Sequence, residues 1–269
     1  MAQTKIAWTE RVWNPVTGCT KVSPGCKNCY AEAIAHRYWG SRKFTDVRVH
    51  ADRMDTPLHW RKPSRVFVNS MSDLFHDDVP DEFIAQVFGV MAVAEHHVFQ
   101  VLTKRPGRMC RLLQSDSFRD HFWRGANQAE ELKRGEKLER EMHYPTETDQ
   151  WLPLKNVWIG VSVENQEQAD TRIPPLLQTP AAVRWLSVEP MLGPIVIDHY
   201  AQDYIDWIVV GGESGSNFRK MDPQWLESFV MRCKRNIPVF VKQDSGRFPG
   251  KQGSIPDRLW IKEYPRTEP

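Results

Sequence analysis

Short apolar runs alternate with amphipathic segments along most of the chain. Runs rich in valine, isoleucine, phenylalanine and tryptophan occur at residues 65–70, 98–102, 156–162, 183–188, 206–211 and 238–241. Each run is short enough for one strand and apolar enough to be covered on both faces, which is typical of parallel sheets. We therefore predict six parallel strands, preceded by a short strand at residues 12–14.

Helical spacing of apolar residues separates these runs. Helices are predicted at residues 30–39, 80–91, 106–113, 165–177 and 223–235. Strands that alternate with helices indicate parallel β/α units. The prediction is an α/β fold, a partial or closed parallel β/α barrel of the TIM type, formed by residues 1–269 as a single domain. A flat doubly wound sheet is the alternative, which is disfavoured because no glycine-rich nucleotide-binding loop follows any strand.

Residues 114–153 interrupt this alternation with a charged segment, in which residues 130–134 favour a helix. We predict an insertion or lid here that stays outside the core.

Composition and charge narrow the class of protein. The chain is 41% hydrophobic and 26% charged, as in globular proteins, and its N-terminal residues lack the apolar stretch of a signal peptide. No apolar run approaches the roughly 18 residues of a membrane span. A cytoplasmic protein with no membrane partner is expected, and an odd cysteine count suits reduced thiols.

The net charge of +2 is spread unevenly. Residues 1–65 hold twelve lysines and arginines against five acidic residues, interleaved with aromatic rings. Cations meet phosphates and rings stack on bases, so this segment predicts a nucleic-acid partner. A solvated basic face with ordinary core aromatics is the alternative.

Three of the five cysteines lie within residues 18–30, with the spacing C-x6-C-x2-C. Pro24 and Gly25 favour a turn that lets the loop fold back, so the thiols of Cys19, Cys26 and Cys29 could bind one metal or cluster. Zinc and cubane iron–sulfur sites both take four ligands. Three cysteines therefore need a borrowed fourth ligand or leave one iron open. A disulfide or a redox dithiol are the alternatives.

Polar residues follow nearly every predicted strand. Because barrel active sites form at the carboxyl ends of the strands, these residues predict a ligand site. Carboxylates there suit ammonium and hydroxyl groups, and glycines allow close approach of a ligand. The predicted cofactor-binding residues are Ser70, Asp73, Ser162, Glu164, Glu189, Gly211, Gly212 and Glu213. The predicted substrate-binding residues, suited to carboxylate or phosphate, are Lys104, Arg105, Lys242 and Gln243. For Lys104 and Arg105, ion pairs with the same carboxylates are the alternative.

Several of these stretches together resemble an uncharacterised family of phage and prophage proteins close to the radical S-adenosylmethionine superfamily. The matching segments are residues 18–32, 69–75, 102–106, 158–165, 186–190, 209–214 and 239–243. The resemblance implies a radical-SAM-like barrel, a [4Fe-4S] cluster on the three cysteines, and S-adenosylmethionine on the fourth iron. It also implies an electron donor as partner and a deoxyadenosyl radical as the reactive species.

Two features depart from the radical-enzyme pattern. The first cysteine gap is six residues instead of three, and the sequence Gly-Gly-Glu at residues 211–213 follows a late strand instead of the second. Either Asp73 binds the cofactor amine in its place, or the cofactor lies differently or is absent.

Three functional hypotheses follow. The first is a radical enzyme that acts on a nucleic acid or nucleotide. The second is a zinc- or cluster-stabilised nucleic-acid-binding protein without catalysis, with His36 or His50 as fourth zinc ligand. The third is a repair enzyme for damaged bases, which would need a base-sized cavity near the cluster.

Overall fold

A computed structural model describes residues 4–138, 152–233 and 237–265 of the protein. These residues form two compact units. Unit 1 comprises Met1–Thr20, Lys43–Ile159 and Thr179–Ala182, and unit 2 comprises Lys21–Arg42, Gly160–Gln178 and Val183–Pro269.

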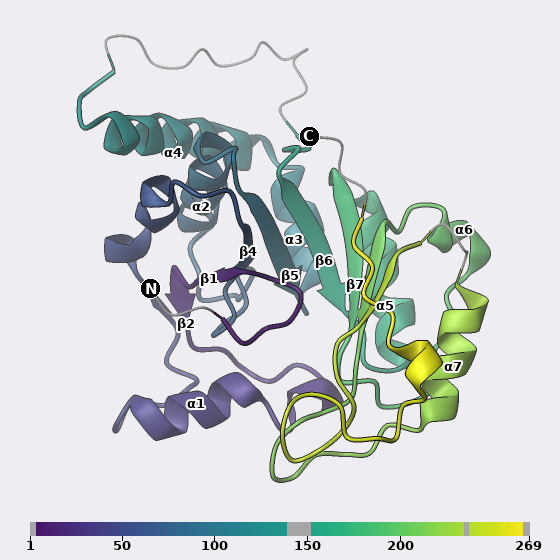
Figure 1. Ribbon diagram of the computed structural model, residues 1–269. Coiled ribbons are helices and arrows are strands. Elements are labelled where there is room, and N and C mark those ends of the chain that lie inside the picture. Colours follow the sequence, from purple (N-terminus) through teal and green to yellow (C-terminus); the bar gives the residue numbers. More distant parts are fainter. Residues whose placement is uncertain (1–3, 139–151, 234–236, 266–269) are drawn as a thin grey trace. The chain divides into compact units, whose positions relative to one another are not determined.

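Parallel strands form the frame of the fold and follow the sheet order β1-β4-β5-β6-β7-β8-β9 (Figure 1). All seven coincide with predicted strands, so the α/β fold on a parallel sheet is confirmed. Their bounds are β1 Arg11–Trp13, β4 Arg65–Val68, β5 Val98–Thr103, β6 Val157–Ser162, β7 Val183–Val188, β8 Trp207–Val210 and β9 Val239–Val241.

In unit 1, β4 pairs in parallel with both β1 and β5, which places Phe67 opposite Val12 and Gln100. The helices α2 (Asp81–Val93) and α3 (Pro106–Leu113) follow β4 and β5, as predicted. The remaining small elements are the antiparallel pair β2 (Val16–Thr17) and β3 (Arg48–Val49), and the 3-10 turns η2 (Ala51–Arg53) and η3 (Thr56–His59).

The helix α4 (Asp116–Arg134) corrects the interpretation of residues 114–153. Ser115 caps its start by accepting a hydrogen bond from the Phe118 amide at 3.3 Å, and Gly135 ends it in the left-handed conformation. Phe118 and Phe122 are fully buried. Residues 116–134 are therefore one long helix that contributes to the core, and the expectation of a segment outside the core is wrong for them. Residues 139–151 lie outside the described residues.

In unit 2, β8 pairs in parallel with β7 and β9. Its helices are α1 (Tyr30–Tyr38), α5 (Gln166–Gln178), α6 (His199–Gln202) and α7 (Pro223–Arg232), with 3-10 turns η1 (Pro24–Cys26) and η4 (Asp257–Leu259). The core is aromatic: the Trp185 and Trp207 rings lie 5.4 Å apart, and Tyr264 stacks on Trp207. The predicted helix at residues 223–235 ends at Arg232, and positions 234 and 235 lie outside the described residues.

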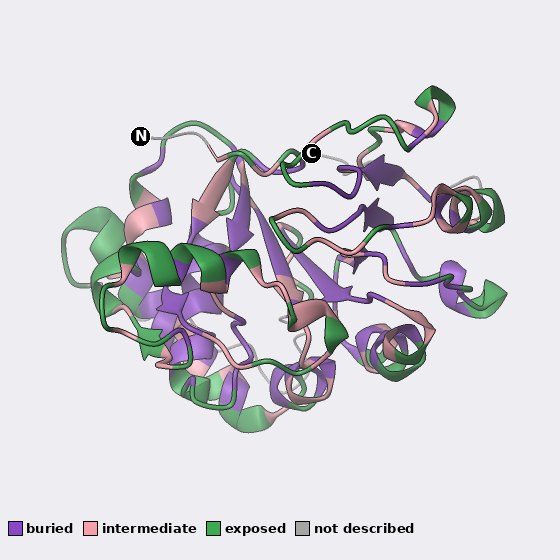
Figure 2. Cartoon of the chain, turned by 90° about the horizontal axis from the view of Figure 1, so that it is seen from below, coloured by how far each residue is buried: buried purple, intermediate pink, exposed green. Residues whose placement is uncertain are grey.

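Burial follows the alternation of the sequence. The strands β4 to β9 of the parallel sheet are mostly buried, whereas β1 is largely half-buried and β3 is exposed (Figure 2). Of the helices, α2 is buried at most of its positions, and α4 buries one side and exposes the other. Among the described helices, none combines the length and the apolar character that crossing a membrane requires.

Candidate functional site

The chain leaves β4 through an unusual backbone position in unit 1. Asn69 has a φ of 61°, and its side-chain oxygen accepts a hydrogen bond from the Val16 amide at 3.1 Å. Asparagine tolerates this left-handed conformation better than most residues. The Ser70 hydroxyl donates to the Asn14 side chain at 3.2 Å. Asn69 and Ser70 thereby connect the end of β4 to the segment before the first cysteine. They also fix the direction in which the following loop leaves the strand.

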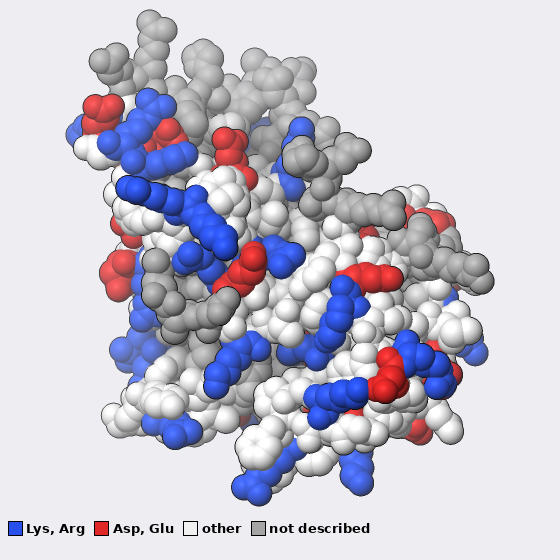
Figure 3. All heavy atoms as spheres, in the orientation of Figure 1, with Lys and Arg blue, Asp and Glu red and all other residues white. Residues whose placement is uncertain are grey.

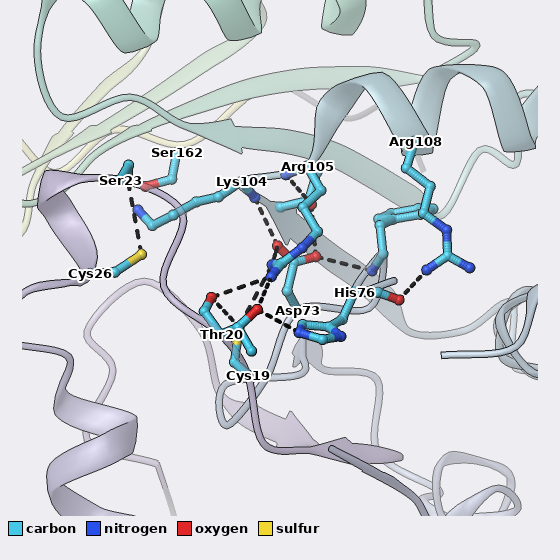
Figure 4. A network of polar contacts seen from close by, with 12 residues as sticks. Cys19, Thr20, Ser23, Cys26, Asp73, His76, Lys104, Arg105, Arg108 and Ser162 are labelled. Carbon is cyan, nitrogen blue, oxygen red and sulfur yellow. Dashed lines mark hydrogen bonds and ion pairs between the residues drawn. The ribbon is translucent and has the colours of Figure 1, made fainter. Parts of the chain in front are cut away.

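Asp73 lies at the centre of a buried network in unit 1 (Figure 4). One carboxylate oxygen accepts from the Thr103 hydroxyl at 2.7 Å and the Phe75 amide at 3.0 Å. The other accepts from the Lys104 amide at 3.0 Å and from Arg105 at 3.1 Å. Four donors occupy this carboxylate, so Asp73 acts as an anchor for the end of β5.

Arg105 links that anchor to the first cysteine. Its guanidinium donates to the Thr20 carbonyl at 3.2 Å and the Thr20 hydroxyl at 2.9 Å, and it lies 3.7 Å from the Cys19 sulfur. Although burial opposes its charge, the Asp73 carboxylate and the Cys19 thiol raise the pKa of Arg105. A guanidinium beside a sulfur favours the thiolate.

His76 completes the network and can be assigned a tautomer. Its Nδ1 accepts from the Asp78 amide at 3.1 Å, which leaves Nε2 to carry the proton toward the Thr20 hydroxyl at 2.8 Å. Burial, followed by the charge of Arg105, lowers the pKa of His76, which keeps the ring neutral. Arg108 donates to the carbonyls of His76 and Val79 and holds this loop from the α3 side.

In unit 2, Glu164 accepts hydrogen bonds from the cysteine loop at its Pro24-Gly25 turn. Its fully buried carboxylate accepts from the Ser23 hydroxyl and from the Gly25 amide at 3.0 Å on one oxygen, and from Arg172 at 2.9 Å on the other. A Cβ at Gly25 would lie 2.8 Å from the Glu164 carboxyl carbon. A larger residue at position 25 would therefore displace the Glu164 carboxylate from its hydrogen bonds.

Glu213 holds the same loop at a second point. Its carboxylate accepts from the Asn28 side chain at 2.9 Å and from the Arg219 guanidinium and amide. Arg219 also donates to the Pro24 carbonyl at 3.0 Å. Burial alone would raise the pKa of Glu213, but the hydrogen bonds from Arg219 and Asn28 lower it overall. The ionised carboxylate therefore holds residues 24–28 in place, directly through Asn28 and indirectly through Arg219.

The two thiols of this loop, Cys26 and Cys29, interact electrostatically with Lys21. Burial raises the pKa of Cys29, while the amides of Glu32 and Ala31 at the start of α1 favour its thiolate. Lys21 forms an ion pair with Glu32 at 2.8 Å. That hydrogen bond raises the pKa of Lys21, and the nearby Cys29 and Cys26 add to the rise. The Ser23 hydroxyl lies 3.8 Å from the Cys26 sulfur (Figure 4).

Glu189, after β7, differs from the other buried carboxylates. It pairs with Lys242, whose Nζ lies 3.3 Å from Oε1. Within the described residues, that buried Oε1 accepts no hydrogen bond. The Ser162 hydroxyl donates to the Glu189 carbonyl at 3.3 Å. Among the predicted ligand-binding carboxylates, Glu189 therefore keeps the greatest capacity to accept a hydrogen bond from a ligand.

The glycine pair after β8 has a structural role that the sequence did not predict. A Cβ at Gly212 would lie 2.3 Å from the Ser245 amide nitrogen, and one at Gly211 would lie 3.0 Å from Glu189 Oε1. The Gln243 side chain donates to the Gly212 carbonyl at 2.8 Å. The close approach that these glycines allow is made by the chain after β9. The expectation that they let a ligand approach the backbone stays a prediction, and at Gly211 the nearest side-chain atom is Glu189 Oε1.

The three cysteines of the loop are chemically suitable ligands for a metal that binds thiolates. Within the described residues none of the five cysteines forms a disulfide, and Cys19, Cys26 and Cys29 are partly exposed. The Arg105 guanidinium lies 3.7 Å from the Cys19 sulfur, and Lys21 interacts electrostatically with Cys26 and Cys29. In the described parts of the chain, no three histidine, cysteine or acidic side chains are arranged to hold a metal ion.

The two histidines considered as zinc ligands differ in their surroundings. His50 Nε2 lies 2.8 Å from the Thr17 hydroxyl. His36 is exposed in the last turn of α1.

The sequence placed the polar strand ends correctly but missed their partners. The missed partners are Thr20, Ser23 and Asn28 within the cysteine segment itself, and His76, Arg172 and Arg219 outside it. A buried arginine in a helix, such as Arg172, can be suspected only once the helix face is known. Of these partners, only Ser23 could have been suspected from its sequence neighbours, because it directly precedes the Pro24-Gly25 turn.

Comparison with known proteins gives one match. A family model described as "Protein of unknown function (DUF5131)" matches residues 3–255. No curated protein and no solved structure matches the chain.

Proposed function

We propose that this chain, which belongs to the DUF5131 family of proteins of unknown function, is an iron–sulfur protein of the radical S-adenosylmethionine type. Cys19, Cys26 and Cys29 would hold a [4Fe-4S] cluster, and the parallel β/α fold would be a partial barrel of the TIM type. A nucleic acid or nucleotide is the proposed substrate class.

The observation that carries this proposal is the support given to the cysteine segment. Asp73 with Arg105 holds the Cys19 end, and Glu164 and Glu213 hold residues 23–28. Burying charged groups is costly unless each is paired and hydrogen-bonded. Paired and buried carboxylates thus anchor the Cys19 end in unit 1 and residues 23–28 in unit 2, which supports the proposal that the positions of these thiols matter.

The remaining polar groups then divide by role. Asp73, Glu164 and Glu213 are positioning residues for the thiols. Glu189, with a buried oxygen that accepts no hydrogen bond from the described residues, suits the ammonium group of a bound cofactor, and Lys242 beside it suits a carboxylate. A cluster of this kind supplies an electron for cleavage of a sulfonium carbon–sulfur bond, which yields methionine and a deoxyadenosyl radical.

Anaerobic reconstitution with iron and sulfide tests the cluster directly. We expect about four irons per chain and the absorbance of a cubane cluster. Cys19→Ser, Cys26→Ser and Cys29→Ser should each lose most of that iron, whereas Cys110→Ser and Cys233→Ser should keep it. A colourless protein with one tightly bound zinc would contradict the proposal and favour a zinc-stabilised binding protein.

Turnover tests the reaction class separately. Reconstituted protein given a strong reductant and S-adenosylmethionine should release deoxyadenosine, detected by chromatography and mass spectrometry. Glu189→Gln should weaken cofactor binding while leaving the iron content unchanged. An intact cluster that produces no deoxyadenosine would support cluster binding and reject catalysis.

A further inference from the structure

The helix α1 presents its apolar residues in an inverted pattern. It buries two alanines, Ala31 and Ala35, and exposes Tyr30, Ile34 and Tyr38 to 49%, 40% and 68%. Helices normally bury their largest apolar residues and expose small or polar ones. These three residues repeat every four positions, so they form one stripe along the exposed side of the helix. Burial raises the pKa of the Tyr30 hydroxyl, so that end of the Tyr30 ring is enclosed, whereas burial within the described structure does not account for the exposure of Ile34 and Tyr38.

Cations accompany the stripe. Residues 21–42 contain Lys21, Lys27, Arg37 and Arg42 against the single acid Glu32, and Glu32 is already paired with Lys21. The Arg37 guanidinium lies 5.3 Å from the Tyr38 ring centre, and Arg42 lies 4.1 Å from the Trp39 ring centre. In Figure 3, lysine and arginine side chains (blue) lie among uncharged ones (white) on the surface over α1.

We infer that this face of α1 binds single-stranded nucleic acid. Exposed rings stack on unpaired bases without regard to sequence, and guanidinium groups beside them meet the phosphates. A purely apolar protein partner would gain nothing from the surplus of positive charge, whereas a polyanion is attracted by it. Because α1 begins directly after Cys29, a strand bound along its nine residues would lie within about 14 Å of that thiol along the helix axis.

The inference goes beyond the proposed function and does not depend on it, because binding to α1 requires no metal. Its test is fluorescence anisotropy with labelled single strands of DNA and RNA, about 20 nucleotides long, which exceeds the site size of typical single-strand binders. The full chain is measured both after metal removal and after reconstitution, over a range of salt concentrations.

Tyr38→Ala should weaken binding about tenfold, as expected for the loss of one stacked base. Arg37→Gln should weaken binding and make the dependence of log affinity on log salt shallower by about one unit. The matched controls are Tyr200→Ala and Arg232→Gln, at exposed positions on α6 and α7. Both controls should bind as the unmodified protein does.

Either of two results would overturn the inference: equal affinity for Tyr38→Ala and Tyr200→Ala, or no binding of the DNA strand or the RNA strand at low salt. In the second case, self-association that Tyr38→Ala abolishes would assign the face to a second copy of the chain. A protein that binds strands in the metal-free form but never assembles a cluster would keep this inference and reject the proposed function.

Discussion

A carboxylate that is fully buried and accepts three hydrogen bonds supports the residues around it, and Glu164 is such a group. Its partners are the Ser23 hydroxyl and the Gly25 amide in the cysteine loop, and Arg172 in α5. Arg172 is itself buried, with its side chain 4% exposed. Removing the negative charge therefore leaves a buried guanidinium without its counter-charge and releases the loop at the same time.

For Glu164→Gln we predict a loss of about 3–5 kcal/mol in the free energy of unfolding, the usual cost of breaking a buried pair. Urea denaturation measures it. Ser23→Ala, which leaves the ion pair intact, should cost only about 1 kcal/mol. Both variants should increase the rate at which a thiol reagent modifies Cys26 and Cys29 in the native protein.

The control for Glu164 is Glu167→Gln, three residues along on the exposed side of α5. This change should alter stability by less than about 0.5 kcal/mol. Unchanged stability and unchanged thiol reactivity in Glu164→Gln would show that the carboxylate does not hold the loop.

At this scale the sequence showed which positions matter but not what they bind. Glu164 and Glu213 were singled out because they follow buried strands, and that placement was correct. Their partners lie 139 and 185 residues away in the chain, at Gly25 and Asn28. A hydrogen-bond partner at such a distance is set by tertiary packing, which local patterns do not encode.

Two glycines allow α2 and α4 to approach each other closely. A Cβ at Gly89 would lie 2.5 Å from the Ala126 amide nitrogen, and one at Gly125 would lie 2.7 Å from the Gln86 Cα. In both cases the obstacle is backbone, which cannot move aside as a flexible side chain can. The glycines thus set the distance between these two helices, with Phe88 and Phe118 in contact beside them at 5.6 Å.

Gly89→Ala should therefore destabilise the protein by about 1–3 kcal/mol through overpacking, even though alanine favours helices. Gly107→Ala in α3 is the matched change, because its nearest neighbour is the flexible Arg111 side chain at 3.5 Å. It should stabilise by up to about 1 kcal/mol. Thermal denaturation of both variants checks the sign, and a stabilised Gly89→Ala would refute the close crossing.

The strands and α4 show why some elements were predicted well and one was not. Strands buried on both faces appear in the sequence as unbroken apolar runs, so their positions were evident. The buried residues of α4, among them Phe118, Phe122 and Ala126, also follow a helical spacing, but charged residues of its exposed face separate them. Judged by its number of charged residues alone, this segment was therefore mistaken for a solvent-exposed insertion.

For the molecule as a whole, stability near neutral pH depends on buried groups that resist protonation. His97 is fully buried, its Nε2 lies 3.3 Å from the Pro57 carbonyl, and its ring lies 3.9 Å from that of His96. Burial, followed by the charge of His96, lowers the pKa of His97 to about 4. His76 has its pKa lowered by burial as well, so it acts in the same direction.

The sign of the effect follows from proton uptake. Between the usual histidine pKa of 6.5 and the folded value of about 4, the unfolded chain takes up a proton at residue 97 and the folded protein does not. Lower pH therefore favours the unfolded state across this interval. Glu213, whose pKa is lowered in the folded protein, adds a loss of stability that begins near its usual value of 4.5 and continues as pH falls.

We accordingly predict that the urea midpoint falls as pH decreases from 6.5 to 4. His97→Gln should flatten the dependence of the unfolding free energy on pH in this interval, by up to about 1.4 kcal/mol per pH unit, the value for one proton. The slope is the decisive quantity, because replacing a buried ring also lowers stability at every pH. His199→Gln, at an exposed position of α6, should keep the slope of the unmodified protein. Equal slopes in all three proteins would mean that His97 titrates in the folded state as it does in the unfolded chain, and that burial at this position does not exclude its charged form.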